Sequence, residues 1–508
     1  MFRRRAIVFF ILIFLSFGLQ SCLGTTKYEK EFEGYRETET VVDDWYSTYI
    51  LDMKAGYDHV HVTKGTLDGS EVVKVVEEGA VIFKFNDRKE PVVNDIYGEA
   101  FLTADEERGL LGFMYRMTIL SHEVLIEGIR SGDFILVDFH SGGGEQHIKF
   151  SADQNIYPSV ALTYIAIEEA VNMAKGGGFV QGRKFKYRVF IENLKVIKDM
   201  EVEVLGVDEI AVDGQKRKVY KVETTIEGYK STSWVGIDGR VVREITMERF
   251  EARLTDREEA KNLDGAGITF DDILKIALVP SDKRIKDPEG LKLLKVRIDD
   301  FPKTSSALTG DFQSLEGTDD EKGYIFTMRR GEIEEGTPVK YGNFPEDVRE
   351  YLLPSIDVES DHKSIVSKAK EIAGGGKDPV EDAEKILDWV FKNVEKKMVD
   401  ATSALDVLNT LEGECESHAY LSAALLRAGG IPAKVISGII YSEDLDGFFF
   451  HAWNEVYLGK WIPVDATFGQ FPADPTHIKF SEGGRSSLLD IIPLIGSIKV
   501  DVLEMVRE

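Results

Sequence analysis

Three residues whose side chains could cooperate in nucleophilic catalysis lie close together near the C-terminus of the sequence. Cys415 stands in the run GECESHA, His451 in the run HAWNEVY and Asp465 in the run WIPVDAT. A thiol can attack a carbonyl carbon, an imidazole can take the thiol proton, and a carboxylate can orient the imidazole. The sequence therefore predicts a nucleophile, a base and an orienting group within one short span.

Cys415 is expected in the first turn of a helix. Residues 415–428 are rich in alanine and leucine, contain no proline or glycine, and are followed by two glycines that would end the helix. The free N–H groups and the positive end of the helix dipole favour a thiolate, so we expect the pKa of Cys415 to lie below the value of roughly 8.5 of a free thiol. Glu414 and Glu416 would oppose this shift unless their side chains point to solvent.

His451 and Asp465 are expected on the two arms of a β-hairpin. Residues 449–457 and 460–465 are β-prone, and a tight turn near Leu458 would set His451 opposite Asp465 to within one residue. Because side chains alternate along a strand, the two would share one face of the sheet. The carboxylate would then hold one ring nitrogen and leave the other to accept the thiol proton.

Three more side chains are candidates for the wall of the site. His418 lies one helical turn after the cysteine, but no carboxylate is expected beside it, so packing within the helix is the alternative interpretation. Trp453 and Trp461 flank the base and the orienting group. Packing in the core is favoured over substrate contact for both tryptophans.

The same blocks resemble the transglutaminase-like superfamily. The resemblance rests on G-x-C-x-x-x-A, A-L-L-R-A-x-G-I-P-A-K, H-A-W-x-E-V-Y and W-x-P-V-D-A-T, and it covers roughly residues 365–480. It implies a papain-like core of helix and sheet with Cys415 as nucleophile, His451 as base and Asp465 as orienting group. The superfamily includes cross-linking enzymes, peptidases, deamidases and proteins without activity, so the resemblance implies the fold more directly than the reaction.

The N-terminus has the pattern of a bacterial lipoprotein signal. Three arginines precede an apolar stretch over residues 6–19, which is short for a membrane span, and the stretch leads into Leu-Gln-Ser-Cys. This resembles a lipobox, so we expect removal of residues 1–21 and lipidation of Cys22. An ordinary signal peptide or an uncleaved anchor helix are the alternatives. The expected location is the cell envelope, with a lipid anchor in the membrane and the body facing the periplasm or the exterior.

Each of the two cysteines in the sequence belongs to its own motif, so no disulfide is expected. Once Cys22 is acylated, Cys415 would be the only free thiol. An unpaired thiol in an exported protein risks oxidation or mispairing. Its presence therefore fits a nucleophile better than a packing residue.

Composition limits the kinds of partner. The formal net charge of −27 disfavours nucleic acid and direct adsorption to anionic lipid, and it indicates an acidic solvated surface. No ligand set with metal-site spacing and no cofactor motif is found, so neither a metal nor a cofactor is expected. The expected partners are a protein or peptide substrate and, through the lipid anchor, the membrane.

The fold class is predicted to be α+β, with two or three domains in 508 residues. We expect a signal peptide over 1–21, an anchor and linker over 22–59, an antiparallel β-rich domain over 60–255, a small β connector over 256–350 and a transglutaminase-like catalytic domain over 351–508. Asp-Gly pairs at 68–69, 213–214 and 238–239 predict hairpin turns in the β-rich domain, and a helix is expected near 160–175. The pattern W-x-x-x-D-G-R-V-V-R-E from Trp234 loosely resembles exported half-barrel domains related to lipoprotein carriers.

These observations predict a membrane-anchored cysteine enzyme of the cell envelope that cleaves or transfers acyl groups at amide bonds. Hydrolysis is favoured over cross-linking because water is the default acceptor and nothing in the sequence specifies an amine site. The alternative is a catalytically inactive envelope protein of the same fold, in which the β-rich half binds a peptide, a glycan or a lipid.

Overall fold

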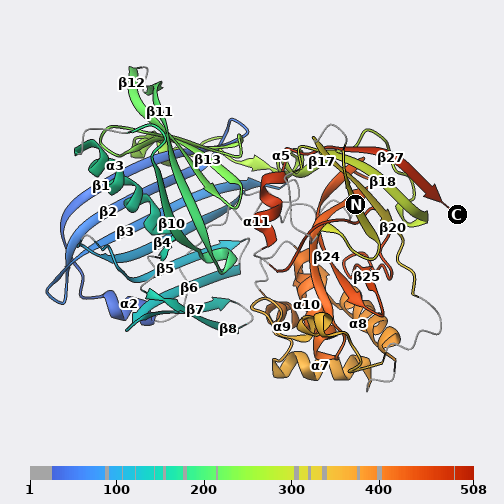
Figure 1. Ribbon diagram of the computed structural model, residues 1–508. Coiled ribbons are helices and arrows are strands. Elements are labelled where there is room, and N and C mark those ends of the chain that lie inside the picture. Colours follow the sequence, from blue (N-terminus) through green and yellow to red (C-terminus); the bar gives the residue numbers. More distant parts are fainter. Residues whose placement is uncertain are drawn as a thin grey trace. The chain divides into compact units, whose positions relative to one another are not determined.

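The structure is a computed structural model, and it is drawn in Figure 1. It describes residues 26–85, 91–105, 107–119, 122–141, 144–152, 156–175, 180–212, 215–301, 308–318, 322–333, 340–374, 378–397, 403–484 and 487–507. The chain forms two compact units, here called the N-terminal unit (mainly residues 26–270) and the C-terminal unit (mainly residues 271–508). Each unit is described by itself.

The N-terminal unit is built on one large sheet. Strands β8 to β1 lie side by side in descending order, β1 pairs with β15, and β15 to β9 continue in descending order. The pairs from β1 to β7, from β10 to β15 and between β1 and β15 are antiparallel, whereas β9 with β10 and β3 with β16 are parallel. The strands are β1 (Arg36–Ile50), β2 (Met53–Leu67), β3 (Ser70–Lys84), β4 (Val92–Thr103), β5 (Leu110–Ile119), β6 (His122–Ser131), β7 (Phe134–Ser141), β8 (Gly144–Ser151), β9 (Ile156–Pro158), β10 (Lys184–Ile191), β11 (Val196–Val212), β12 (Gln215–Ile226), β13 (Tyr229–Val235), β14 (Val241–Thr246), β15 (Phe250–Thr255) and β16 (Ile268–Thr269).

Short helical segments accompany this sheet. They are α2 (Lys27–Phe32), η3 (Ser159–Ala161), α3 (Leu162–Lys175), η4 (Glu192–Leu194) and α4 (Arg257–Lys261). Tyr164 and Ile165 of α3 join strand residues such as Val60, Val73 and Val137 in one buried apolar cluster. Helix α3 therefore packs on the apolar face of the sheet, and the helix expected near 160–175 is confirmed.

The β-rich character of this unit is as the sequence predicts, but the sheet begins earlier. Asp68 and Gly69, with φ of 50° and 83°, form the tight turn between β2 and β3, as an Asp-Gly pair predicts. Residues 213–214, where another turn is expected, lie outside the described residues. The linker expected up to residue 59 is wrong over most of its length, because α2 covers Lys27–Phe32 and β1 starts at Arg36. The first five residues of β1 are exposed, and their polar composition hides the strand.

The C-terminal unit contains two sheets and a group of helices. One sheet has the order β17-β24-β23-β26 with β25 paired to β24, the other has the order β19-β20-β18-β27, and β21 and β22 form a short parallel ladder. The strands are β17 (Leu278–Pro280), β18 (Leu291–Asp299), β19 (Gln313–Gly317), β20 (Gly323–Arg329), β21 (Glu395–Lys396), β22 (Glu412–Gly413), β23 (Ala433–Ser442), β24 (Gly447–Tyr457), β25 (Trp461–Val464), β26 (Ile478–Glu482) and β27 (Val500–Arg507). The helical segments are α5 (Phe270–Ala277), η5 (Pro288–Gly290), α6 (Glu346–Arg349), η7 (Glu350–Leu352), α7 (Lys363–Ala373), α8 (Pro379–Asn393), α9 (Ala404–Thr410), α10 (Cys415–Ala428), α11 (Leu488–Ile491) and η9 (Ile492–Leu494).

Helix α10 is the centre of this unit, because it contacts α7, α8 and α9 as well as strands β23 and β24. The small β connector expected over 256–350 does contain strands β18, β19 and β20. However, β18 also pairs with the C-terminal strand β27, so these strands form a sheet within the C-terminal unit. Across the described parts of the chain, we find no helix of sufficient length and apolarity to span a membrane.

Candidate active site

Helix α10 carries Cys415 into the core of the C-terminal unit. The helix runs from Cys415 to Ala428, which are the bounds that the sequence predicts. A side chain at Gly413 would overlap that of Ser417, so glycine lets the chain pass close to the helix that it enters. Every residue from Cys415 to Leu426 is buried. The helix is thus packed on all sides, and the nucleophile candidate at its start has a fixed backbone.

Strands β24 and β25 form the predicted hairpin and carry the other two candidates. His451 lies on β24 and Asp465 directly follows β25. The predicted register is wrong by two residues: continuing the observed pairs sets Trp453, rather than His451, opposite Asp465. The cause is that the turn is centred on Gly459, with φ of 90°, and not on Leu458. Because the shift is an even number of residues, His451 and Asp465 still share one face.

His451 and Asp465 are in direct contact. The Nε2–H of His451 donates to Oδ2 of Asp465 at 2.8 Å, and the backbone N–H groups of Thr467 and Phe468 donate to Oδ1 at 2.7 and 3.3 Å. The other ring nitrogen of His451, Nδ1, is buried and makes no hydrogen bond to any residue that the structure describes. This tautomer leaves Nδ1 as an acceptor, which is the state a general base requires.

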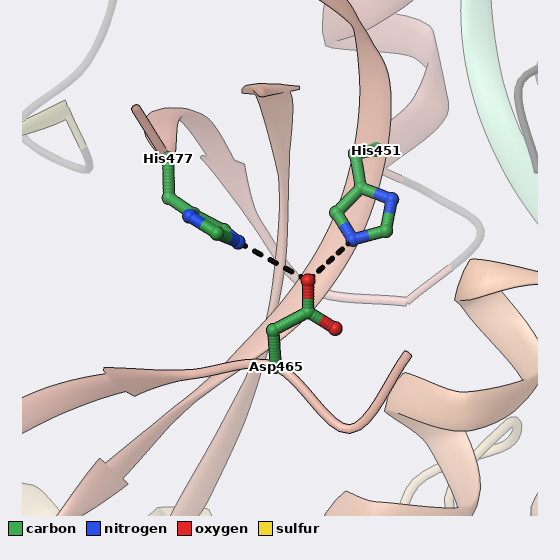
Figure 2. Close-up of side chains that lie close together, drawn as sticks. All are labelled: His451, Asp465 and His477. Atoms are coloured by element: carbon green, nitrogen blue, oxygen red, sulfur yellow. Dashed lines mark hydrogen bonds and ion pairs between the residues drawn. The ribbon is translucent and has the colours of Figure 1, made fainter. Parts of the chain in front are cut away.

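A second histidine binds the same carboxylate oxygen, and sequence reasoning missed it. His477 precedes β26, and its Nε2–H donates to Oδ2 of Asp465 at 3.1 Å, while its Nδ1 lies 3.0 Å from the carbonyl oxygen of Asp474. Figure 2 shows both imidazole rings pointing at that one oxygen of Asp465. No motif surrounds His477. The signal available in the sequence was its residue type, a histidine ten residues after Thr467, where the last block of the resemblance ends.

The charges of this cluster follow from its contacts. Burial opposes ionisation of Asp465, but the two imidazoles outweigh it and hold the pKa of the carboxyl below its ordinary value. Burial also opposes protonation of His477, yet its bonds to Asp465 and Asp474 raise its pKa to about 10. By contrast, burial lowers the pKa of His451, and Asp465 offsets only part of this effect. At neutral pH His477 is therefore a cation and His451 is a neutral base.

The surroundings of Cys415 differ from the sequence-based expectation. Burial raises the pKa of its thiol well above the ordinary value, and the charges of Glu416 and Glu414 raise it further. Both glutamates are buried rather than turned to solvent, with 2% and 0% of their surface exposed. A hydrogen bond from the backbone N–H of Ala452, the residue after His451, acts in the opposite direction but does not outweigh them. The expected low pKa is therefore wrong for this structure, in which the thiol is neutral.

The three residues expected at the wall of the site are mainly packing residues here. His418 has no exposed surface, its Nδ1 lies 2.8 Å from the carbonyl oxygen of Glu414, and burial lowers its pKa to about 4. Trp453 is buried and stacks on His451 with ring centroids 6.2 Å apart. Trp461 is half-buried and packs edge-on against Tyr457. Trp453 therefore supports the base directly, whereas Trp461 packs on Tyr457 at the end of β24.

A cavity of about 250 Å³ lies beside the base. Its wall includes Phe449 and Phe468, whose rings also contact the imidazole of His451 at centroid distances of 5.9 and 5.1 Å. His477 and Asp474 line the same cavity. Cys415 itself has no exposed surface. Reaching its sulfur from outside thus requires side chains to move.

His451, Asp465 and His477 also form a set of metal-ligand types, with one ligand atom from each lying within 4.8 Å of the others. Two imidazoles and a carboxylate are a common donor set for zinc. Here, however, both Nε2–H groups donate to Asp465, so both nitrogens would have to lose a proton before they could bind a cation. The donor chemistry fits a hydrogen-bonded cluster better than a metal centre.

Comparisons with known proteins agree with the resemblance. Residues 366–466 match the family model described as the transglutaminase-like superfamily. The C-terminal part of this chain therefore contains a transglutaminase-like domain, which includes Cys415, His451 and Asp465. Cys22 and the expected signal peptide lie outside the described residues.

Similar proteins include two relatives in sequence and two solved structures. An uncharacterised protein of Haemophilus influenzae is 34% identical over 27% of this chain and 45% of its own length, and one of Mycobacterium leprae is 29% identical over 19% and 35%. The chain thus spans less than half the length of these relatives. A solved structure of a proposed cysteine protease from Cytophaga hutchinsonii is 20% identical, covers 43% of this chain and 86% of its own, and has a TM-score of 0.28. A proposed protease from Parabacteroides distasonis is 10% identical over 66% and 62%, with a TM-score of 0.17.

Proposed function

We propose that the protein is a cysteine enzyme that hydrolyses amide bonds through Cys415, His451 and Asp465. The observation that carries the proposal is the state of His451, whose Nε2–H is held by Asp465 at 2.8 Å while its buried Nδ1 has no hydrogen-bond partner among the described residues. Burying an acceptor without a partner costs about 1–3 kcal/mol. Such a cost is expected where the atom serves to take a proton.

The reaction begins with the neutral thiol. Nδ1 of His451 takes the proton of Cys415 as the sulfur bonds to the carbonyl carbon of the substrate, and Asp465 stabilises the imidazolium that forms. The C–N bond then breaks, and the imidazolium returns its proton to the leaving amine, which leaves a thioester on the sulfur. Water attacks the thioester, His451 takes the proton of that water, and the acid product departs as the imidazolium reprotonates the thiolate. The backbone N–H of Cys415, in the first turn of α10, is a candidate donor to the oxyanion.

Whether water or an amine accepts the acyl group can be tested directly. We expect water to be preferred, so incubation with a glutamine-containing protein and a labelled primary amine should release ammonia or new termini faster than it incorporates the label. Faster incorporation of the label would identify a cross-linking enzyme and contradict this part of the proposal. Cys415→Ser serves as the control for background hydrolysis.

We further propose that the chain is attached to the membrane of the cell envelope by lipid on Cys22. The support is the sequence alone, with its basic start, its short apolar stretch and its Leu-Gln-Ser-Cys ending. In cells given a labelled fatty acid, the protein should carry the label and sediment with membranes, and Cys22→Ser should lose the label. Label that persists in Cys22→Ser would rule out this residue as the attachment point.

The alternative, an inactive envelope protein with a binding function in its β-rich half, predicts no acyl-enzyme on Cys415. Ligand binding by the N-terminal unit and catalysis by the C-terminal unit do not exclude each other. Activity must therefore be tested at Cys415 itself, and binding must be tested separately.

A further inference from the structure

The N-terminal unit contains a cavity of about 370 Å³ that the proposed reaction does not use. It lies between α3 and the strands from β10 to β14, and its wall is made mainly of apolar side chains. Examples are Leu162, Met200, Val202 and Val222. Its volume falls within the range of about 300–1,000 Å³ that is usual for small-molecule sites.

The polar groups at this cavity are carboxylates and hydroxyls. None of the described residues that line it is a lysine, arginine or histidine, whereas Glu77, Glu169 and Glu244 all line it. Arg108, which does not line the cavity, neutralises Glu169 with an Nη2–Oε1 distance of 3.0 Å. Two glutamates therefore remain at the cavity without a basic residue in the lining to balance them.

Glu244 is held in a fixed position at the wall. The hydroxyl of Ser231 donates to Oε1 at 2.8 Å and that of Ser233 donates to Oε2 at 2.9 Å, and both serines line the cavity as well. The hydroxyl of Thr246, which also lines the cavity, donates to Oε1 at 3.5 Å, so Oε2 is the oxygen that keeps an acceptor site for a further donor. A built polar site thus sits on a wall that is mainly apolar.

Glu77 approaches the same space from strand β3. Its surroundings contain acids: Asp58, Glu192 and Glu244 all act on it. Burial raises the pKa of Glu77 well above the ordinary value, and these three neighbours raise it further. In the empty cavity these effects favour the neutral acid form of Glu77, and a cation placed here would favour its ionised carboxylate by attraction.

We propose that this cavity binds a small amphiphile, an apolar chain ending in a cationic amine, with the amine at the carboxylates of Glu77 and Glu244. The apolar wall takes the chain and the two carboxylates select the head group by charge. A ligand with an anionic head would add a like charge to an acidic wall, and a neutral head would lack the ionic attraction. The proposal concerns the N-terminal unit and does not depend on activity at Cys415.

The head group can be tested on the unmodified protein by titration calorimetry with dodecylamine, dodecanol and dodecanoate below their micelle-forming concentrations. We expect the amine to bind at least tenfold more tightly than the alcohol, and the carboxylate to bind most weakly. Within an octyl, decyl and dodecyl amine series, each added CH₂ should tighten binding by up to about fourfold until the cavity is filled. Equal affinity for the three head groups, or no binding by any of them, would overturn the proposal.

Two isosteric variants locate the site. Glu77→Gln and Glu244→Gln should each reduce the preference for amine over alcohol while leaving the affinity for the alcohol within about twofold. Glu209→Gln, on strand β11 with an exposed side chain, is the matched control and should bind like the unmodified protein. An unchanged amine preference in both Glu77→Gln and Glu244→Gln would place the amine elsewhere. Tighter binding of a short apolar peptide with a free N-terminus than of dodecylamine would also contradict the assignment to a small amphiphile.

Discussion

At the scale of single residues, the distribution of charge around Asp465 is the main feature of the site. One carboxylate oxygen accepts hydrogen bonds from two histidines, and these histidines have opposite protonation tendencies. His477 lies against Asp474 as well and is cationic, whereas His451 faces Asp465 alone and is neutral. His477 thus acts as a positioning residue, because it holds Asp465 ionised and in place for His451.

The role of His477 predicts how stability depends on pH. Its pKa is raised in the folded protein to about 10, so the folded state binds more protons than the unfolded state between the unfolded pKa of roughly 6.5 and about pH 10. The stabilisation is fully present below the lower value and is lost as pH rises through the upper one. Over this window, the free energy of unfolding should fall by up to about 1.4 kcal/mol per pH unit more in the wild type than in His477→Gln.

Denaturant unfolding followed by circular dichroism, repeated from pH 6 to pH 10, measures this slope. His147→Gln is a suitable control because His147 also contacts an aspartate, Asp138 at 2.7 Å, but is exposed. It should follow the wild type. Equal slopes for wild type and His477→Gln would mean that His477 is not protonated in the folded protein.

The thiol of Cys415 gives a second prediction at this scale. Because burial and two buried glutamates raise its pKa, alkylation by iodoacetamide should be slow at pH 7 and should increase only above the ordinary thiol pKa of roughly 8.5. Removing one of the two charges in Glu416→Gln should shift the pH–rate curve to lower pH. Rates measured on a chain that begins after Cys22 report this thiol alone. Fast alkylation well below pH 8 would show a thiolate paired with the imidazolium and would contradict the neutral state described above.

At the scale of elements, the site depends on how helix α10 is attached to the sheet that contains β23 and β24. Asn454 of β24 makes this attachment with its side-chain amide, which donates to the carbonyl oxygens of Ala419 on α10 and Lys434 on β23, each at 3.0 Å. Asn454 has no exposed surface. This amide therefore links the helix that carries the cysteine to the strand that carries the base.

Replacing this amide should affect both stability and catalysis. Asn454→Ala leaves one buried and one partly buried carbonyl group without this donor, so we expect a loss of about 2–4 kcal/mol in the free energy of unfolding. The acylation rate of Cys415 should fall more than tenfold in the fraction that stays folded, because α10 can then shift against β24. Asn393→Ala, which removes an exposed amide that bonds one carbonyl on its own helix, should change neither quantity by much. An Asn454→Ala protein with unchanged acylation would contradict this role.

The elements of the site could largely be predicted from sequence, whereas their exact alignment could not. The bounds of α10 follow from local composition and the glycines after it, and the hairpin follows from two β-prone runs around a Leu-Gly pair. The register was off by two residues because the sequence does not reveal whether Leu458 or Gly459 takes the centre of the turn. His477 was missed because it reaches Asp465 through the fold, by way of a loop between β25 and β26, and not through a motif.

At the scale of the whole molecule, the pairings that complete each unit join distant segments. Strand β1 pairs with β15, and β18 pairs with β27, over separations of about 200 residues in each case. Local patterns contain no information on such partners. For this reason the β-rich character of the N-terminal unit could be predicted, but its strand order and the closure of the second C-terminal sheet by β27 could not.

The formal charge of −27 belongs to this scale as well. A strongly acidic surface disfavours binding to nucleic acid and direct adsorption to anionic lipid, so the membrane attachment that we propose would require a tether. This agrees with the proposal that lipid on Cys22 makes the attachment. An acidic protein also attracts cations, which agrees with the amine site proposed in the N-terminal unit.

We propose that His451, held by Asp465, makes Cys415 a nucleophile. The most direct measurement is the intact mass of the protein after mixing with an activated acyl ester at pH 7.5, with the site of modification located by peptide mapping. We predict a single acyl group on Cys415 in the wild type, at least 100-fold slower acylation in His451→Gln and Asp465→Asn, and an unchanged rate in His147→Gln. Equal acylation rates in the wild type and in folded His451→Gln, or no acyl group on Cys415 of the wild type, would contradict the proposed role of these residues.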